Sequence, residues 1–265
     1  MSATLPTRMV EKPWGRDVLP APFTAPPGQR IGEVWFEPPA SLPELLIKYI
    51  FTSEKLSVQV HPSDAQLPGH GKEECWLVIA AEPGAALGVG FREPIGAKAM
   101  RAAALDGSIE QLLEWYPVSA GDFFYIPAGT VHAIGAGVSL IEVQQTSEVT
   151  YRLYDYGRPR ELHLDQGIAV ASGAPHPAAL RRHLDDTGAA ALVQGPLFRL
   201  DRIADAPTVA TFAEYGTEPV LAIPLQQPVT IGSEVIAPGS CGLAKSLAAI
   251  DFANDGICLI SQPCK

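Results

Sequence analysis

Several features are scarce in this sequence of 265 residues. The four cysteines form no CxxC pair and no regular framework; they are Cys75, Cys241, Cys258 and Cys264. This spacing excludes a disulfide-stabilised scaffold and indicates reduced thiols. No stretch approaches the roughly 18 uncharged apolar residues of a membrane span, and the N-terminal MSATLPTRMVEKPWG lacks the apolar segment of a secretory signal. We therefore expect a cytoplasmic protein.

Positive charge is scarce as well. Nineteen Lys and Arg stand against 29 Asp and Glu, which gives a net charge of −10. Nucleic acid and anionic membranes both attract basic surfaces, so the charge argues against either as a partner. A small anionic substrate is compatible with it, because a local cluster of Lys and Arg overrides the global field. We expect a small-molecule partner, and a monomer or a small homo-oligomer.

Glycine and proline are abundant, with 24 and 25 residues in a chain that is 47% hydrophobic. This composition favours short strands and turns. The first part of the chain is predicted to form strands at 31–36, 46–51, 56–61, 74–79, 121–126, 131–134, 140–143 and 150–153. Helical spacing appears in 94–116, with a break at Asp106-Gly107 that suggests two short helices.

The rest of the chain continues this mainly β pattern. Residues 163–196 are predicted to be helical and loop-like, ending in the Ala-rich DDTGAAALVQG, and FRLDRI, VATFAEY, VLAIPL and ICLIS are predicted to be strands. We therefore predict two domains. Residues 1–165 form a β domain with a helical insertion at about 94–116, and residues 166–265 form a helical linker followed by a second β domain.

The segment LSVQVHP places two polar side chains on one strand face. Gln59 and His61 lie at i and i+2 and so project from the same side, and the proline after His61 favours an extended backbone there. Glu74 begins the next strand, with Trp76 on its face and Cys75 on the opposite face. Its neighbour Glu73 is a competing candidate.

A second segment, GDFFYIPAGTVHAIG, places His132 after a strand and a Gly/Pro turn. Two imidazoles, one carboxylate and one amide oxygen from separate strands can hold a divalent metal ion and leave coordination positions open for water or substrate. Taken singly, the Gln-x-His pair could be a surface strand edge and His132 a hydrogen-bonded core histidine. The second β block contains no equivalent pair, so we expect it to be metal-free.

The spacing G-x5-P-x-G-x2-H resembles the second motif of the cupin superfamily, whose members are double-stranded β-helix (jelly roll) barrels. The chain more closely resembles type I mannose-6-phosphate isomerases (phosphomannose isomerases) in their short bacterial form. The matching motifs are KPWG (12–15), IGEVW (31–35), LSVQVHP (56–62), GKEECW (71–76), GDFFYIPAGTVHAIG (121–135) and TYRLYDYGRPRELH (150–163). The likeness is close over about residues 10–170 and looser beyond.

This resemblance implies one bound Zn²⁺ per chain, or another divalent transition metal, and selects Glu74 over Glu73. The implied ligands are Gln59, His61, Glu74 and His132. It also implies that Arg152 and Lys72 lie in the active site. The chain departs from larger members in two ways: Gly71 separates His70 from Lys72, where they have a His directly before the Lys, and the large helical domain is missing.

The implied reaction interconverts mannose 6-phosphate and fructose 6-phosphate through a metal-stabilised enediolate. Arg152 would share the negative charge, unless it pairs with Asp155 or Glu161. The candidates for moving the proton are Lys72, with a pKa depressed by the metal and Arg152, and a water on the metal. Lys72 could instead be a solvated loop lysine.

The phosphate would be held by residues in the same motif region, for which the candidates are Ser57, Lys55, Arg158 and Arg160.

Two rival functions fit a cupin barrel. One is an iron dioxygenase, which would have little use for Arg152 or a phosphate cluster. The other is a non-catalytic module that binds a sugar phosphate without exchanging protons at C1 or C2.

Overall fold

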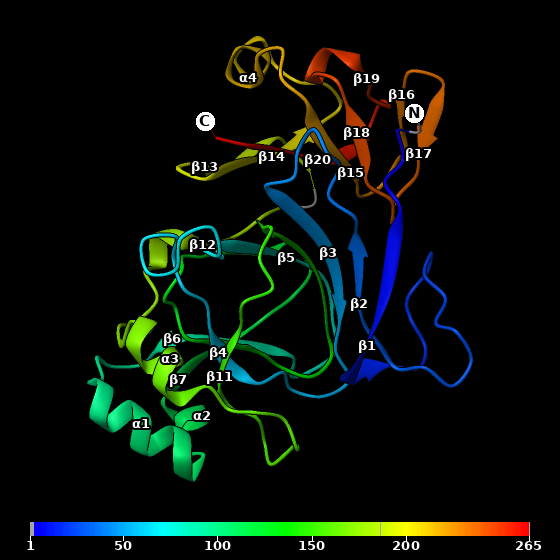
Figure 1. Cartoon of the computed structure of the whole chain (residues 1–265). Coiled ribbons are helices and arrows are strands. Elements are labelled where there is room, and N and C mark those ends of the chain that lie inside the picture. Colours follow the sequence, from blue (N-terminus) through cyan, green and yellow to red (C-terminus); the bar gives the residue numbers. More distant parts are fainter. Residues whose placement is uncertain (1–2, 186, 265) are drawn as a thin grey trace.

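The computed structural model describes residues 3–185 and 187–264. The chain forms two β units, one stacked on the other, with helices α1, α2 and α3 at the far side of the first unit (Figure 1). All pairings between the named strands of these residues are antiparallel. The prediction of a mainly β fold is therefore confirmed.

The first unit contains a larger and a smaller sheet. In spatial order the larger sheet consists of β1 (Thr7–Arg16), β2 (Ile31–Phe36), β3 (Leu45–Phe51), β10 (Val138–Gln145), β5 (Glu74–Ala81), β8 (Asp122–Ile126) and β12 (Arg181–His183). The smaller sheet consists of β11 (Tyr151–Tyr154), β4 (Val58–Val60), β9 (His132–Ile134), β6 (Ala86–Phe91) and β7 (Leu113–Pro117). The eight strands predicted in this region are present, with ends displaced by at most two residues.

Strand β4 separates two environments. Val58 and Val60 are fully buried in a cluster that includes Met100 and Ala104 of α1 (Ala97–Asp106). The alternate residue Gln59 faces the interior of the barrel and pairs in register with His132 on β9. This alternation places apolar packing on one face of the strand and polar side chains on the other.

The predicted helical insertion is only partly correct. Helix α1 ends at Asp106, and Gly107 caps it in the left-handed conformation with φ 83°, as the Asp-Gly break suggests. The short α2 (Ile109–Leu112) follows, but residues 113–117 form strand β7 instead of continuing the helix, because they pair with β6. Helix α3 (Leu164–Val170) follows β11 and contacts α1.

The second unit has a five-stranded and a three-stranded sheet. The first consists of β13 (Ala190–Gln194), β14 (Phe198–Ala204), β20 (Ile257–Pro263), β15 (Val220–Pro224) and β18 (Gly242–Ala244); the second consists of β17 (Glu234–Ile236), β16 (Val229–Ile231) and β19 (Ile250–Asp251). Short 3-10 turns lie at Ala178–Leu180 and Leu247–Ala249. A buried apolar cluster joins this unit to the larger sheet through residues such as Phe123 and Phe198.

Two predictions in this part were wrong. VATFAEY forms helix α4 (Val209–Tyr215), whose N-terminus is capped where Thr211 N donates to Thr208 Oγ1 at 3.1 Å. The Ala-rich stretch contains strand β13, which pairs with β14. No helix in the described part of the chain has the length and apolar character needed to cross a bilayer.

Candidate metal centre and cavity

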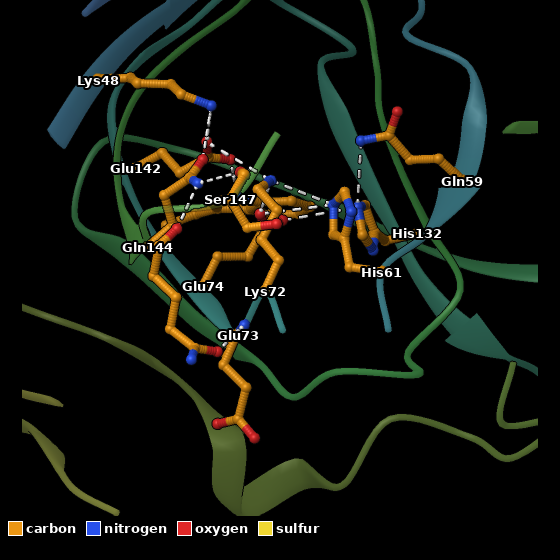
Figure 2. Close-up of polar contacts among 12 residues, drawn as sticks. Lys48, Gln59, His61, Lys72, Glu73, Glu74, His132, Glu142, Gln144 and Ser147 are labelled. Atoms are coloured by element: carbon orange, nitrogen blue, oxygen red, sulfur yellow. Dashed lines mark hydrogen bonds and ion pairs between the residues drawn. The ribbon is translucent and has the colours of Figure 1, made fainter. Parts of the chain in front are cut away.

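Three side chains that can hold a metal ion converge between the two sheets of the first unit. The ligand atoms of His61, Glu74 and His132 all lie within 4.8 Å of one another, and all three residues are buried. His61 follows β4 and His132 begins β9 in the smaller sheet, whereas Glu74 begins β5 in the larger one. Figure 2 shows the two rings side by side, with Glu74 approaching them and Gln59 nearby. The group exists only when the two sheets are closed on each other.

Backbone carbonyls fix the orientation of both imidazoles. His61 Nδ1 lies 2.8 Å from the carbonyl oxygen of Val149, and His132 Nδ1 lies 2.9 Å from that of Thr130. Each Nδ1 therefore carries the hydrogen and donates it, which leaves the lone pair of Nε2 directed at the centre of the group. Histidines that bind metals are usually oriented by such bonds.

Glu74 has an unsatisfied oxygen at the same point. Its Oε1 is buried without a hydrogen-bond partner and lies 3.5 Å from His132 Nε2, while Oε2 lies 3.6 Å from His61 Nε2. A buried carboxylate oxygen without a partner is costly. A divalent cation bound by two imidazole nitrogens and this carboxylate would satisfy it, so the donor set suits a metal of the zinc class.

Gln59 adjoins the group through its amide. Its Nε2 lies 3.3 Å from His132 Nε2, and its Oε1 accepts a hydrogen bond from Ser57 Oγ at 3.0 Å. A half-turn of the amide exchanges the oxygen and the nitrogen, and the Ser57 hydroxyl can then accept instead of donate. The amide oxygen can therefore join the donor set without moving the strand.

Burial is the largest influence on the pKa values of the side chains around the centre. Burial and the nearby Lys72 lower the pKa of His132 to about 4 and also lower the pKa of His61. Burial and the charge of Glu142 raise the pKa of Glu74 to about 7, although Lys72 opposes the shift. The histidines are thus neutral and able to act as ligands near neutral pH.

Lys72 contacts two of the three metal-binding side chains. Its ammonium donates to Glu74 Oε2 and lies 3.2 Å from His61 Nε2. Burial opposes its charge, but the carboxylates of Glu142 and Glu74 outweigh burial and raise the pKa of Lys72. Lys72 is 4% exposed and is not a solvated loop residue.

A second buried network, absent from our predictions, lies on the larger sheet. Glu142 on β10 is directly opposite Lys48 on β3, and its carboxylate accepts from Lys48 Nζ at 3.0 Å and from Trp76 Nε1 at 3.0 Å. Lys48 Nζ also donates to Gln144 Oε1 at 2.5 Å (Figure 2). The sequence signal was present, since LLIKYIF places Lys48 inside an otherwise apolar strand, and VSLIEVQQ places Glu142 between Ile141 and Val143.

These residues border a cavity of about 330 Å³. Its wall includes Gln59 and Lys72, which contact the three candidate metal ligands, and Lys48 and Glu142 from the second network. Arg152 also lines the cavity, because it lies opposite Gln59 in the β11–β4 register and therefore shares its face. Burial and repulsion from Arg160 lower the pKa of Arg152.

The structure places two of the four residues predicted to hold phosphate in the cavity wall and two outside it. Ser57 and Arg160 line the cavity, together with His163. Lys55 and Arg158 are not among the lining residues. Lys55 Nζ pairs with Glu110 at 2.5 Å, and Arg158 pairs with Asp155 at 3.0 Å and donates to the carbonyl of Lys55.

Two neighbours of Glu74 face away from the centre. Glu73 accepts a hydrogen bond from the Tyr125 hydroxyl, and Figure 2 shows its carboxylate directed away from the histidines. Cys75 is buried in the apolar cluster between the two β units. His70 contributes its carbonyl oxygen to a hydrogen bond from Ser147 Oγ at 2.9 Å. The described cysteines are all free thiols.

Comparison with curated proteins shows relatives of one kind, although no protein-family model matches the chain. A mannose-6-phosphate isomerase from Streptococcus mutans is 39% identical over 209 residues, which are 73% of this chain and 65% of that protein. A mannose-6-phosphate isomerase from Bacillus subtilis is 42% identical over 141 residues, which are 48% of this chain and 43% of that protein. The chain thus spans less than two thirds of the length of these relatives. The resemblance to mannose-6-phosphate isomerases predicted from the motifs is confirmed.

Solved structures share the fold. The mannose 6-phosphate isomerase from Bacillus subtilis superimposes with a TM-score of 0.79 at 21% identity, covering 98% of each chain. A mutant of phosphomannose isomerase from Salmonella typhimurium gives a TM-score of 0.72 at 12% identity, covering 100% of each chain. At these identities the likeness establishes the fold over the whole chain.

Proposed function

We propose that this chain is a metal-dependent aldose–ketose isomerase that interconverts mannose 6-phosphate and fructose 6-phosphate, with Zn²⁺ as the expected ion. The observation that carries the proposal is the convergence of His61, Glu74 and His132 beside a cavity lined by cationic side chains. The curated relative that is 39% identical and is named a mannose-6-phosphate isomerase supports the same reaction.

Such a reaction moves a proton between C2 and C1 of the sugar, and the barrier lies in the negative charge that develops on the two oxygens. A divalent ion held by His61, Glu74, His132 and the amide oxygen of Gln59 would supply Lewis-acid polarisation when bound. The protein itself must then supply fixed donors and exclude water. The remaining residues of the cavity match these tasks.

Arg152 is placed to share the developing charge. Its guanidinium keeps its charge at neutral pH and presents a planar fork of donors, and the residue lies on the same sheet face as Gln59. Its Nη1 donates to the carbonyl of Glu161 at 3.4 Å, a backbone contact that holds the side chain without neutralising it. The charge of Arg152 is therefore not neutralised by an ion pair with Asp155 or Glu161.

Lys48 and Lys72 bring two ammonium groups to the opposite wall. Glu142 lies between them, 3.0 Å from Lys48 Nζ and 3.9 Å from Lys72 Nζ, and pairs with both ammonium groups. Repulsion between them is offset by this shared carboxylate and by Glu74. Each ammonium can donate a hydrogen bond to a sugar oxygen, and it can give a proton to one oxygen and take one back from the other.

The size of the cavity suits one small sugar phosphate. Its volume of about 330 Å³ is at the small end of the range of roughly 300–1,000 Å³ for small-molecule sites. Ser57, Arg160 and His163 line it as donors for a phosphate. A dioxygenase has no need of so many cations, which favours the isomerase over that alternative.

The decisive assay incubates the purified chain with mannose 6-phosphate and follows fructose 6-phosphate, with and without a chelator and after adding Zn²⁺ back. We expect turnover that the chelator abolishes and the metal restores. Binding of the sugar phosphate without exchange of deuterium at C1 or C2 would indicate a non-catalytic module. Oxygen consumption with a catechol or thiol and no isomerisation would indicate the dioxygenase. Either outcome refutes the proposal.

A further inference from the structure

The segment after β11 contains one buried carboxylate that binds two arginines. Asp155 is 2% exposed. It accepts from Arg158 Nη1 at 3.0 Å, and from Arg160 Nε and Nη2 at 2.6 Å each. The two arginines are two positions apart in sequence and share one anion. Their other surroundings differ.

Arg158 is directed away from the cavity. In addition to Asp155, its Nη2 donates to the carbonyl oxygen of Lys55 and lies 3.7 Å from a carboxylate oxygen of Glu54. Its side chain is 15% exposed. These contacts tie the segment to residues 54–55, immediately before the strand that carries Gln59.

Arg160 is directed into the cavity. Its side chain is 25% exposed, and the residue lines the cavity together with Arg152 and His163. Asp155 accepts two of the five N–H groups of its guanidinium, so three are not used by this ion pair. A bidentate carboxylate fixes both the position and the plane of a guanidinium.

The backbone between Asp155 and Arg158 is fixed in an uncommon conformation. Arg158 N donates to the carbonyl of Asp155 at 3.0 Å, closing a turn in which Tyr156 has φ 55° and Gly157 has φ 77°. A tyrosine in the left-handed region is disfavoured and is retained where its surroundings determine it. The ion pairs of Asp155 with Arg158 and Arg160 hold Tyr156 in this conformation.

Cationic side chains outnumber acidic ones along the cavity wall, where Lys12, Lys48, Lys72, Arg152 and Arg160 stand against Glu33, Glu142 and Glu148. Arg152 and Arg160 both line it, and the negative charge of Asp155 is divided between Arg160 and Arg158. This positive end belongs to a chain with a net charge of −10. A dianion is the ligand that such an end would attract from solution.

We propose that Asp155 is a positioning residue that assigns its two arginines to different tasks. Arg158 anchors the segment to residues 54–55, and Arg160 is presented beside Arg152 to bind the phosphate group of the substrate. This inference rests on the proposed function for the identity of the sugar. The binding of a phosphate dianion at this end can be measured without any turnover.

The test compares Asp155→Asn, Arg160→Gln and the double variant with the native chain. Inorganic phosphate is titrated calorimetrically, and KM and kcat are measured with mannose 6-phosphate. We expect Asp155→Asn to weaken phosphate binding and raise KM about tenfold, with kcat within about threefold and metal content unchanged. Because Asp155 acts through Arg160, the double variant should bind phosphate no more weakly than Arg160→Gln alone.

Asp165→Asn is the matched control, since that aspartate is 87% exposed and pairs with Arg101 on the surface. It should leave both measurements unchanged. If Asp155→Asn is too unstable to purify, Asp155→Glu keeps the charge but displaces the guanidinium, and it should weaken phosphate binding in the same way.

Unchanged phosphate affinity in the Asp155 variant, or additive losses in the double variant, would overturn the inference while leaving the isomerase proposal intact. Weakened phosphate binding in a protein that does not isomerise mannose 6-phosphate would overturn the proposed function and leave the role of Asp155 intact.

Discussion

Replacing Glu142 with glutamine should destabilise the folded chain substantially. Glu142 is 3% exposed and lies between the ammonium groups of Lys48 and Lys72. Glu142→Gln keeps the shape and one acceptor for Trp76 Nε1 but removes the negative charge. Two buried ammonium groups would then face each other with their shared anion gone, which is the costly outcome for a buried ion pair.

The magnitude follows from the acidity of this carboxyl. Burial opposes its charge, but Lys48 and Lys72 outweigh burial and lower the pKa of Glu142 from 4.5 to about 2. That difference corresponds to about 3 kcal/mol of stability at neutral pH, which agrees with the roughly 3–5 kcal/mol measured when one partner of a buried pair is removed. For a chain of this size it lowers the midpoint of thermal unfolding by about 6–12 °C.

The pH dependence gives a second signature. Because the pKa is lower in the folded state, the stabilisation is fully present above about pH 4.5 and is lost as the pH falls towards 2. Urea unfolding of the native chain in excess chelator, measured across this range, should show the loss. The Glu142→Gln variant should lack this component.

Two further variants check the assignment. Glu82→Gln removes a carboxylate whose side chain is 64% exposed and should change stability by less than about 1 kcal/mol. In Glu142→Gln, Lys72 keeps its ion pair with Glu74, whereas Lys48 loses its carboxylate partner. Glu142→Gln combined with Lys48→Met removes that cation and should recover part of the loss. If the free energy of unfolding of Glu142→Gln lies within about 1 kcal/mol of that of the native chain, the buried ion pair is not the stabilising element described above.

Three other changes test the site and its support. His132→Ala should lose both bound metal and turnover; full metal occupancy by elemental analysis would show that the ligand set is wrong. Arg152→Met should keep the metal and lower kcat by about 100-fold, and a near-normal kcat would remove Arg152 from the mechanism. Gly71→Ala should cost about 1–3 kcal/mol in urea unfolding, because an added Cβ would lie 2.5 Å from Asp64 N. Gly96→Ala, where nothing lies within 4 Å, is the control, and equal losses in both would contradict the packing argument.

Local rules were sufficient for much of the candidate centre. The alternation of Gln59 and His61 and the turn before His132 depend on short-range geometry, so their placement could be predicted from sequence. Glu74 was harder, because strand parity shows that it and Glu73 face opposite sides without showing which side is the interior. That choice depends on how β5 pairs with β10, where Glu74 lies opposite Gln144.

Other features depended on contacts that no local pattern contains. Lys48 and Glu142 are 94 residues apart and meet only through the β3–β10 register. Arg158 and Arg160 have the same spacing as Gln59 and His61, yet they lie in a turn in which Arg160 N donates to the carbonyl of Arg158 at 2.8 Å, and their side chains reach different places. VATFAEY has the β-branched and aromatic residues of a strand, but the Thr208 cap and its tertiary setting made it a helix.

Strand β4 also limits which mutations the chain can tolerate. Val58 and Val60 on one face pack among apolar side chains, and Gln59 on the other face lines the cavity beside the candidate metal centre. Inserting or deleting a single residue there would exchange the two faces at once, burying an amide among methyl groups and directing valines at the cavity. Substitution is therefore tolerable in this segment only position by position, and a change of length would damage folding and chemistry in one step.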